Sequence, residues 1–544
     1  MLERDGMQKT LTTLLALACG LSLDICQAQT SVEPREEVIV TGRRTHLGRP
    51  NRLSDAVLTG DLAAAKALIE KGVDIEELDT RPSIAGPYGR RPLNWAALRN
   101  DTAMIELLLD AGAKINAVNR TTHFSALHHA VEANANDALK VLIARGADLD
   151  LRNSNGQTPL EFAVANNRVA AFEILKAAEC AARKCEDDTA ARATDLAELL
   201  ARLDAEVPGW LKQADVPGAA VAVIQGGVVT ATRGYGLANV KKNIPVTPTT
   251  GFNVGSISKT IAAWGVMTLV EQGKLDLDAP VETYLTRWHL PDTKFDERGV
   301  TIRRLLSHTA GLSLHGYPGW GPHKVLPTLE QSLSGKTNGA GAVYLITDPG
   351  TRWQYSGGGY TLAQLIVEEV TGKSFEDYIR EAVLRPLGMT ASDYHLSKEL
   401  IARSSLAYVE RSSPTPNPRF TEQAAAGLHT TVEDLAKFAA AALATDTGKP
   451  AGRGVLKPQT VELMLTPAPA SNGAYGLGYA TTLRSTGRRG RGHGGSNRGW
   501  EAVFDVMPET GDGIVVLTNS SNGGQVYQSV VQTWDRWLRG ASAP

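Results

Sequence analysis

Cysteine, net charge and long apolar runs are all scarce in this chain of 544 residues. Its four cysteines are too few for a disulfide-built scaffold of this length. The formal net charge is −2 and there is no long run of like charges, so the composition does not favour a nucleic-acid partner. Hydrophobic residues make up 42% and charged residues 21%, as in a globular protein with ample core. The length predicts two or more domains.

Two common hydrolase signatures are also missing. No Gly-x-Ser-x-Gly sequence is present, which argues against a nucleophile elbow and the α/β-hydrolase fold. No cluster of metal ligands of the metallo-hydrolase kind is visible, so we predict no metal and no cofactor. Catalysis, if present, has to come from ordinary side chains.

The first residues have the pattern of an export signal. Arg4 and Lys9 precede an apolar run, Leu11–Leu23, which is too short to span a bilayer. We therefore expect a signal peptide over residues 1–28 and a flexible leader over residues 29–49. Lipidation at Cys19 stays open.

A bacterial periplasm is the expected compartment. Residues 36–44, Glu-Glu-Val-Ile-Val-Thr-Gly-Arg-Arg, resemble the N-terminal box that outer-membrane receptors present to their energy-transducing system. After cleavage of the signal, Cys180 and Cys185 are the cysteines that remain. In an oxidising compartment two such neighbours usually pair, so we predict a disulfide rather than half of a zinc site.

A helical motif recurs between about residues 50 and 180. Leu93, Leu127 and Leu160 stand in equivalent places, 34 and 33 residues apart, and short Gly-containing turns follow apolar stretches. The period and motifs resemble ankyrin repeats, about four of them, with an insertion near residues 80–88 in the first. The resemblance implies an all-α domain that binds proteins. It also makes His128 a structural histidine rather than a metal ligand.

The rest of the chain, residues 195–544 after a linker over 181–194, has a different pattern. A helix is predicted over 195–212, and strands meet in hairpins at 218–235 and 499–519. A final helix follows. Strands at both ends with helices between them predict an α+β domain, an antiparallel sheet with an all-helical lobe inserted in it.

One turn of a predicted helix carries the strongest chemical signal. The pattern indicates a helix over Ser256–Glu271, and residues three apart on a helix share a face, so Ser256 and Lys259 can meet. The helix is apolar on nearly every side, which is typical of a buried helix. Burial lowers the pKa of a lysine, and a neutral amine beside a hydroxyl makes a nucleophile with its base attached.

Three further stretches accompany this turn in order along the chain. They are Thr301–Leu312, Pro349–Gly357 and His493–Ser496, and we expect a helix from about Tyr360 after the second of them. Together with Ser-x-x-Lys they resemble the serine beta-lactamase and penicillin-binding protein superfamily. The resemblance covers about 350 residues and is strongest to the class C enzymes with their D-alanyl-D-alanine carboxypeptidase, D-aminopeptidase and esterase relatives.

The resemblance implies a role for each matching residue. Ser256 is the nucleophile, Lys259 its partner, and Tyr355 the group that exchanges protons with nucleophile and leaving group. The sequence His493-Gly494-Gly495 stands where many relatives have Lys-Thr-Gly, and Ser496 follows it. The backbone N–H groups of Ser496 and Ser256 would form the oxyanion hole.

Two positions depart from the family pattern. Gly357 stands where relatives often have an asparagine that contacts the substrate's amide. His493 replaces a lysine, and at its usual pKa a neutral imidazole attracts a carboxylate only weakly. We also expect Lys259 and His493 to lower the pKa of Tyr355. Both departures favour esters over beta-lactams.

The sequence therefore predicts an exported serine hydrolase that acts through an acyl-enzyme on esters, D-amino-acid peptides or related amides. Its ankyrin module would bind a protein, and no transmembrane span would remain in the mature form. One alternative is a beta-lactamase or cell-wall D,D-carboxypeptidase. The other is a catalytically silent binding or sensor protein of the penicillin-binding fold.

Overall fold

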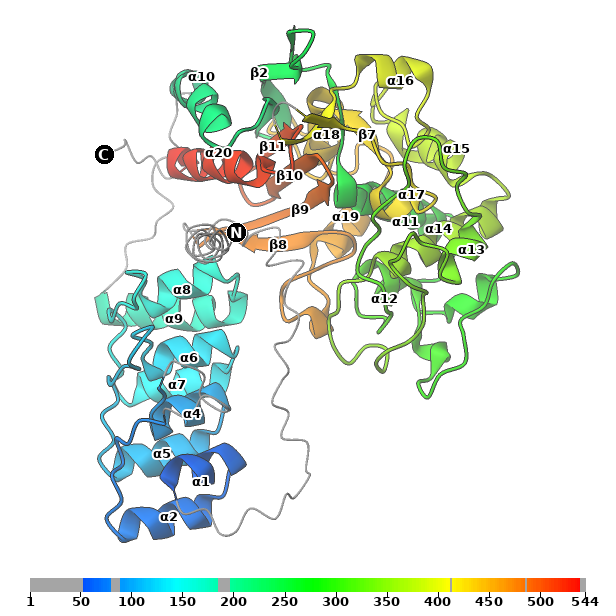
Figure 1. The fold of residues 1–544 in the computed structure, drawn as a ribbon. Coiled ribbons are helices and arrows are strands. Elements are labelled where there is room, and N and C mark those ends of the chain that lie inside the picture. Colours follow the sequence, from blue (N-terminus) through cyan, green and yellow to red (C-terminus); the bar gives the residue numbers. More distant parts are fainter. Residues whose placement is uncertain (1–51, 80–88, 184–195, 411–412, 485–486, 539–544) are drawn as a thin grey trace, which may run out of the picture. The chain divides into compact units, whose positions relative to one another are not determined.

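The computed structural model describes residues 52–79, 89–183, 196–410, 413–484 and 487–538 (Figure 1). The predicted signal peptide and leader, the insertion at 80–88, nearly all of the linker and Cys185 lie outside these ranges. The chain forms two compact units, one within residues 33–190 and the other comprising residues 191–482 and 489–544.

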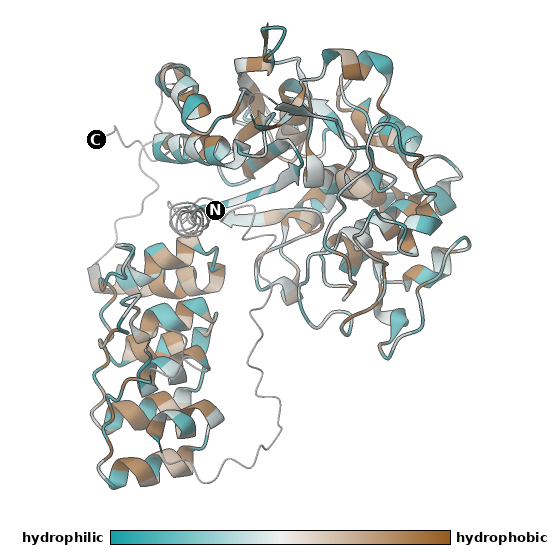
Figure 2. Ribbon diagram, in the orientation of Figure 1, coloured by the Kyte–Doolittle hydropathy of each residue, from teal (hydrophilic) through white to brown (hydrophobic). Residues whose placement is uncertain are grey.

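The N-terminal unit consists of paired short helices. The pairs are α1 (Leu53–Thr59) with α2 (Leu62–Glu70), α4 (Pro92–Leu98) with α5 (Thr102–Asp110), α6 (Ala126–Glu132) with α7 (Asn136–Ala144), and α8 (Pro159–Ala165) with α9 (Val169–Arg183). Asp61 and Asp101 cap α2 and α5 by accepting a backbone N–H, and proline occupies the first turn of α4 and α8. Figure 2 shows that the helices carry hydrophobic and hydrophilic residues side by side. Such helices bury their apolar sides only against neighbours, as in a repeat protein.

Two predicted features of this unit depend on particular residues, and the structure describes the first of them in full. His128 is buried, and its ring nitrogens lie 3.0 Å from Ser125 Oγ and 3.0 Å from the carbonyl oxygen of Gln157. The contact with Gln157 ties the third repeat to the fourth. Cys180, in α9, is disulfide-bonded. Because Cys185 lies outside the described residues, the pairing between the two stays a prediction.

The C-terminal unit is built on a seven-stranded sheet in the order β3-β2-β1-β11-β10-β9-β8. The strands are β1 (Gly218–Gln225), β2 (Val228–Asn239), β3 (Ile244–Pro245), β8 (Ala480–Leu483), β9 (Arg489–Asn497), β10 (Trp500–Met507) and β11 (Asp512–Thr518). The first hairpin and the last one meet where β1 pairs with β11, in the register Val221 with Val516. The antiparallel sheet with strands from both ends of the domain is confirmed, and the structure adds that the two ends meet at the sheet's centre.

Both faces of the sheet are covered. In β1, Ala220 and Ala222 face one core, while Val221 and Val223 face the other. This alternation follows from the two-residue period of a strand, and burial on both faces explains why β1 is apolar throughout. Helices α10 (Leu196–Gln213) and α20 (Gly523–Leu538) cover the second face and lie side by side (Figure 1).

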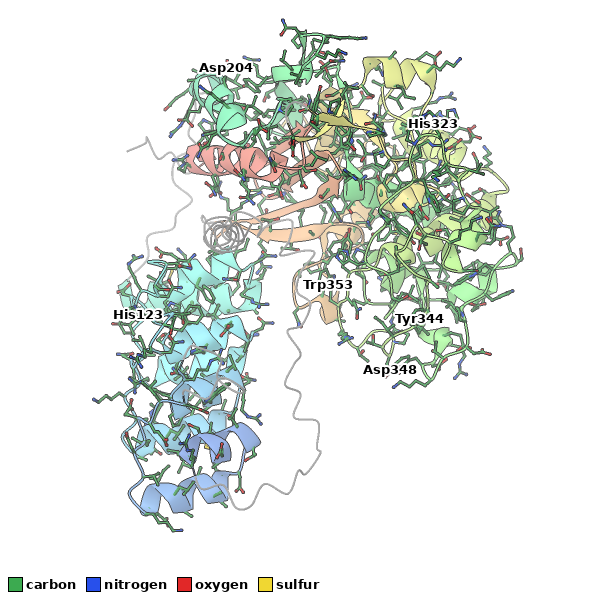
Figure 3. All side chains as sticks on the ribbon, in the orientation of Figure 1. His123, Asp204, His323, Tyr344, Asp348 and Trp353 are labelled. Carbon is green, nitrogen blue, oxygen red and sulfur yellow. The ribbon has the colours of Figure 1, made fainter. Side chains whose placement is uncertain are left out.

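The lobe inserted between β3 and β8 is largely helical. Its helices are α11 (Ser258–Glu271), α12 (Ile302–Leu306), α13 (Leu329–Leu333), α14 (Gly357–Thr371), α15 (Phe375–Ile379), α16 (Lys398–Arg403), α17 (Gln423–Ala426), α18 (Val432–Ala441) and α19 (Pro458–Leu465). Two short antiparallel pairs accompany them, β4 (Gly251–Asn253) with β7 (His429–Thr431) and β5 (Ala407–Glu410) with β6 (Ser413–Thr415). Side chains fill the space between these helices (Figure 3). Of the helices that the structure describes, none is both long and apolar enough to cross a bilayer.

Candidate active site

Ser256 and Lys259 lie at the start of the most deeply buried helix. Ser256 is in a 3₁₀ turn, η2 (Gly255–Ile257), and Lys259 is in the first turn of α11. The Nζ atom of Lys259 lies 3.1 Å from Ser256 Oγ and donates to the carbonyl oxygen of Ala425 at 2.7 Å. The lysine is only 2% exposed, and burial lowers its pKa to about 7. The predicted contact and the predicted direction of the pKa are both present.

A cavity of about 240 Å³ opens over this pair. Its walls are made by Ser256, Lys259, His315, Gly316, Tyr317, Tyr355, Ala425, Ala426, His493, Gly494, Ser496 and Asn497. All of them belong to the C-terminal unit. In the wall that the structure describes, Lys259 is the one lysine or arginine, and no aspartate or glutamate is present.

The Tyr355 ring stands beside the amine of Lys259. Nζ lies 5.0 Å from the centroid of the ring. Histidine rings flank the tyrosine, with His308 at a centroid distance of 4.2 Å and His315 at 4.9 Å. Trp353, labelled in Figure 3, lies edge-on to the same ring, with 6.4 Å between the two ring centroids. This packing fixes the ring plane, and the phenol stays at the cavity wall.

His308 orients the segment that carries Tyr355. Its Nδ1 accepts the backbone N–H of Ser356 at 3.1 Å. Burial lowers the pKa of His308 well below its usual value, and Lys259 lowers it further, so the ring is neutral and free to accept that bond. Ser356 Oγ accepts from Gly359 N–H and donates to the carbonyl oxygen of Ser313. The cap starts α14 at Gly357, three residues earlier than the sequence pattern predicted.

Strand β9 packs its backbone against the turn that holds Ser256. Gly255 has φ of +48°, and a Cβ there would lie 2.8 Å from the backbone nitrogen of Ser496. A Cβ at Gly495 would lie 1.9 Å from the carbonyl oxygen of Val254. Only glycine at both positions allows this approach. It brings the nitrogen of Ser496 next to the nucleophile turn, which is the arrangement that an oxyanion hole requires.

His493 corrects one expectation. The residue lies in the middle of β9, and it is 2% exposed. Burial lowers its pKa to about 3, and nearby Lys259 contributes. The imidazole is therefore neutral at any physiological pH. The expectation of an ordinary pKa was wrong, and a neutral ring has no positive charge with which to lower the pKa of Tyr355.

Gly357 is a second correction, because it does not line the cavity. A Cβ at this position would lie 2.9 Å from the carbonyl oxygen of His315 and 3.3 Å from the Tyr317 ring. The segment 315–317 thus forms the wall at this place, and Tyr317 is held by a 2.7 Å hydrogen bond to Thr361. A side chain is missing at Gly357 because another part of the chain occupies its space.

Sequence reasoning missed several other residues of the wall. His315 and Tyr317 come from an irregular loop without any periodic signal. Asn497 Nδ2 donates to Asn253 Oδ1 at 2.6 Å, and Asn253 Oδ1 also accepts the N–H of Gly255 at 3.0 Å. This pair ties the end of β9 to the nucleophile turn. The one available signal was Asn497's place directly after His-Gly-Gly-Ser.

Comparison with known proteins agrees with this geometry. The family model described as Beta-lactamase matches residues 192–530, and the model for ankyrin repeats matches residues 53–153 and 115–188. The chain belongs to the beta-lactamase family. Within the part of the chain that the structure describes, no group of three acidic, histidine or cysteine side chains could hold a metal ion. The family and the Ser–Lys pair make the protein a serine hydrolase of this superfamily.

Individual relatives are distant but cover most of the hydrolase unit. A putative penicillin-binding protein of Bacillus subtilis is 28% identical over 340 residues, 60% of this chain and 77% of the relative. An unguisins hydrolase of Aspergillus campestris is 30% identical over 325 residues, 56% of this chain and 59% of the relative. The octameric penicillin-binding protein homologue of Pyrococcus abyssi has a TM-score of 0.51 at 28% identity, covering 61% and 77% of the two chains.

Proposed function

We propose that this protein is an exported hydrolase that works through an acyl-enzyme on Ser256 and prefers small neutral esters. The observation that carries the proposal is the position of Lys259 Nζ, 3.1 Å from Ser256 Oγ at a pKa of about 7. Near neutral pH about half of such amines are unprotonated and can accept the serine proton.

Acylation follows from this arrangement. Oγ of Ser256 attacks the acyl carbon while its proton passes to Lys259. The carbonyl oxygen gains negative charge and accepts from the N–H groups of Ser256 and Ser496. One such donor contributes about 3–4 kcal/mol to transition-state stabilisation. The glycines at 255 and 495 hold these two amides together.

Tyr355 serves as the proton carrier to the leaving group. Its ring lies beside the amine of Lys259, and both residues line the cavity. A phenol with an ordinary pKa of about 10 is a poor base. With His493 neutral, Lys259 is the charged group that supports proton exchange at Tyr355. Water then attacks the acyl-enzyme, and Lys259 and Tyr355 transfer the protons in the opposite direction.

The substrate preference rests on what the cavity wall presents. Penicillins and cephalosporins carry a carboxylate, but in the described wall Lys259 is the one cationic side chain, and it is about half neutral at pH 7. His493 adds a neutral ring where many relatives have a lysine. Segment 315–317 fills the space at Gly357 where an asparagine would contact an amide. Esters need neither interaction and have better leaving groups.

The test compares kcat/KM for a p-nitrophenyl ester with that for a chromogenic cephalosporin. We expect the ester value to be higher by at least about tenfold, since one lost polar contact to the substrate costs roughly 1–3 kcal/mol. A higher cephalosporin value would support the alternative of a beta-lactamase. D-Alanyl-D-alanine and D-amino-acid esters in the same panel separate the peptidase alternatives.

A second experiment tests the acyl-enzyme itself. A fluorophosphonate probe should label the protein once, at Ser256, and Ser256→Ala should abolish labelling and turnover while leaving the unfolding midpoint unchanged. Ser332→Ala is the matched control, because Ser332 is a buried serine that lies outside the cavity wall. A protein that is never labelled would be the silent sensor.

The ankyrin unit and the export signal complete the proposal. Ankyrin repeats typically bind proteins, so we propose that residues 45–190 hold a protein partner and that the mature chain acts in a bacterial periplasm. Pull-down with residues 45–190 tests the first part. Fractionation of cells that express the full chain tests the second, and intact protein in the cytoplasmic fraction would contradict it.

A further inference from the structure

Glu501 lies directly beside the residue that closes the proposed oxyanion hole. It is the register partner of Ser496 across β9 and β10, and Ser496 Oγ donates to its Oε1 at 2.5 Å. On its other side, β11 places Thr518 opposite, and Thr518 Oγ1 donates to the Glu501 carbonyl oxygen at 2.8 Å. The first residue of α20, Gly523, would place a Cβ 3.0 Å from the Cβ of Glu501.

This is an unusual place for an acid. Glu501 is 9% exposed, and none of its three neighbours on β9, β11 and α20 carries a charge. Its Oε2 is buried and has no hydrogen-bond partner among the described residues. Burial raises the pKa of Glu501 to about 8, although the Ser496 bond acts against the rise. The side chain is therefore neutral at pH 7, and packing alone favours an apolar residue here.

We propose that Glu501 is a positioning residue for the oxyanion hole. As a neutral acid it accepts the hydrogen bond from the Ser496 hydroxyl, and this bond holds the backbone N–H of Ser496 in place. Ionisation of Glu501 switches the site off. The proposal rests on the role assigned to Ser496 under the proposed function. When Glu501 loses its proton, a buried negative charge lies next to the place where the reaction develops its own negative charge. Like charges repel strongly in a buried setting, so the transition state is disfavoured.

Glu501→Gln provides a selective test. Glutamine keeps the shape and a carbonyl acceptor for Ser496, but it cannot ionise. The wild-type rate of Ser256 labelling by a fluorophosphonate, and kcat for an ester, should fall about tenfold between pH 7 and pH 9.5. In Glu501→Gln this alkaline decline should disappear, while the rate at pH 7 stays within about threefold of wild type. Glu501→Ala, which leaves Ser496 without an acceptor, should be slower at all pH values.

Glu422→Gln is the matched control. Glu422 is also a buried acid whose pKa is raised by burial and whose carboxylate accepts from a serine, Ser332, but it lies outside the cavity wall. This variant should keep the wild-type alkaline decline. Unfolding midpoints at both pH values show whether any rate change reflects loss of the fold.

Each outcome decides the proposal. An alkaline decline that persists in Glu501→Gln, or that vanishes in Glu422→Gln as well, overturns it. So does a Glu501→Ala protein with wild-type kcat. Labelling at Ser256 without ester turnover refutes only the proposed substrate class, since the labelling rates still report on Glu501. A complete absence of labelling removes the proposed function and this inference together.

Discussion

Replacing Lys259 by methionine should make the protein inactive and, at pH 6, more stable. In the folded protein the pKa of Lys259 falls from 10.5 to about 7 because the charged amine is buried. Each unit of pKa corresponds to about 1.4 kcal/mol, so the charged form costs up to about 5 kcal/mol of folding free energy below pH 7. Loss of the bonds to Ser256 and Ala425 offsets about 2–3 kcal/mol of this in the variant.

The contribution of Lys259 to the free energy of unfolding should become more favourable as the pH rises. Between pH 7 and 10.5 the unfolded chain binds more protons at this lysine than the folded protein does, so wild-type stability rises with pH. The penalty is complete below pH 7 and nearly gone at pH 10. Lys259→Met lacks this dependence. Its advantage over wild type should therefore be about 2 kcal/mol at pH 6 and should shrink by about 4 kcal/mol, reversing its sign, by pH 10.

Urea unfolding at pH 6 and pH 10 measures the effect. The transition of the hydrolase unit is identified in the wild type as the one that a Ser256-reactive inhibitor shifts. Lys274→Met is the control, because Lys274 follows the same helix but is exposed. Because the free energy of unfolding of the wild type is subtracted from that of the variant, the contributions of other titrating groups cancel. A difference for Lys259→Met that is equal at the two pH values would show that Lys259 is not desolvated and would remove the basis for its role as the base.

Four further predictions concern the site and the domain organisation. Tyr355→Phe keeps the stacking on His308 but should lose about 10²–10⁴ in kcat; a near-normal rate would contradict its role. Gly255→Ala should cost about 1–3 kcal/mol of stability and more than about tenfold in kcat, because its Cβ meets the Ser496 nitrogen; unchanged kinetics would mean that this approach is not needed. Breaking the Cys180–Cys185 disulfide should lower the free energy of unfolding by on the order of 2 kcal/mol, and two free thiols in protein purified without reductant would show that this disulfide does not form. A fragment of residues 190–544 should retain the full kcat, since every residue of the cavity wall lies within it; a folded but inactive fragment would show that the repeats take part in catalysis.

Much of the fold was predictable because its signals are local. The ankyrin period repeats in consecutive stretches of the sequence, and each repeat pairs helices that are neighbours in sequence. The two hairpins of the C-terminal unit likewise follow from alternating patterns and turn residues. Helix ends were less accurate, as at Gly357, where the cap by Ser356 depends on a contact with Ser313 from another segment.

The reactive pair was also predictable, and for the same reason. Ser256 and Lys259 are three residues apart, so one helical turn brings them together, although the turn is 3₁₀ at the serine. The apolar character of the helix was enough to predict a lowered lysine pKa. Tyr355, His493 and Ser496 could be connected to this pair only through resemblance to a family, because nothing local relates positions 100–240 residues apart.

The tertiary structure alone decided the electrostatics and the shape of the site. The neutrality of His493, the wall formed by residues 315–317 and the burial of Glu501 each depend on segments that approach from distant parts of the chain. A pKa depends on the water removed and the charges nearby, and for His493 and Glu501 both are set by segments that are distant in sequence, whereas the burial of Lys259 was already visible in its own apolar helix. The sequence by itself determined which groups could react; the packing of the sheet and lobe determined their charges and the space left for a substrate.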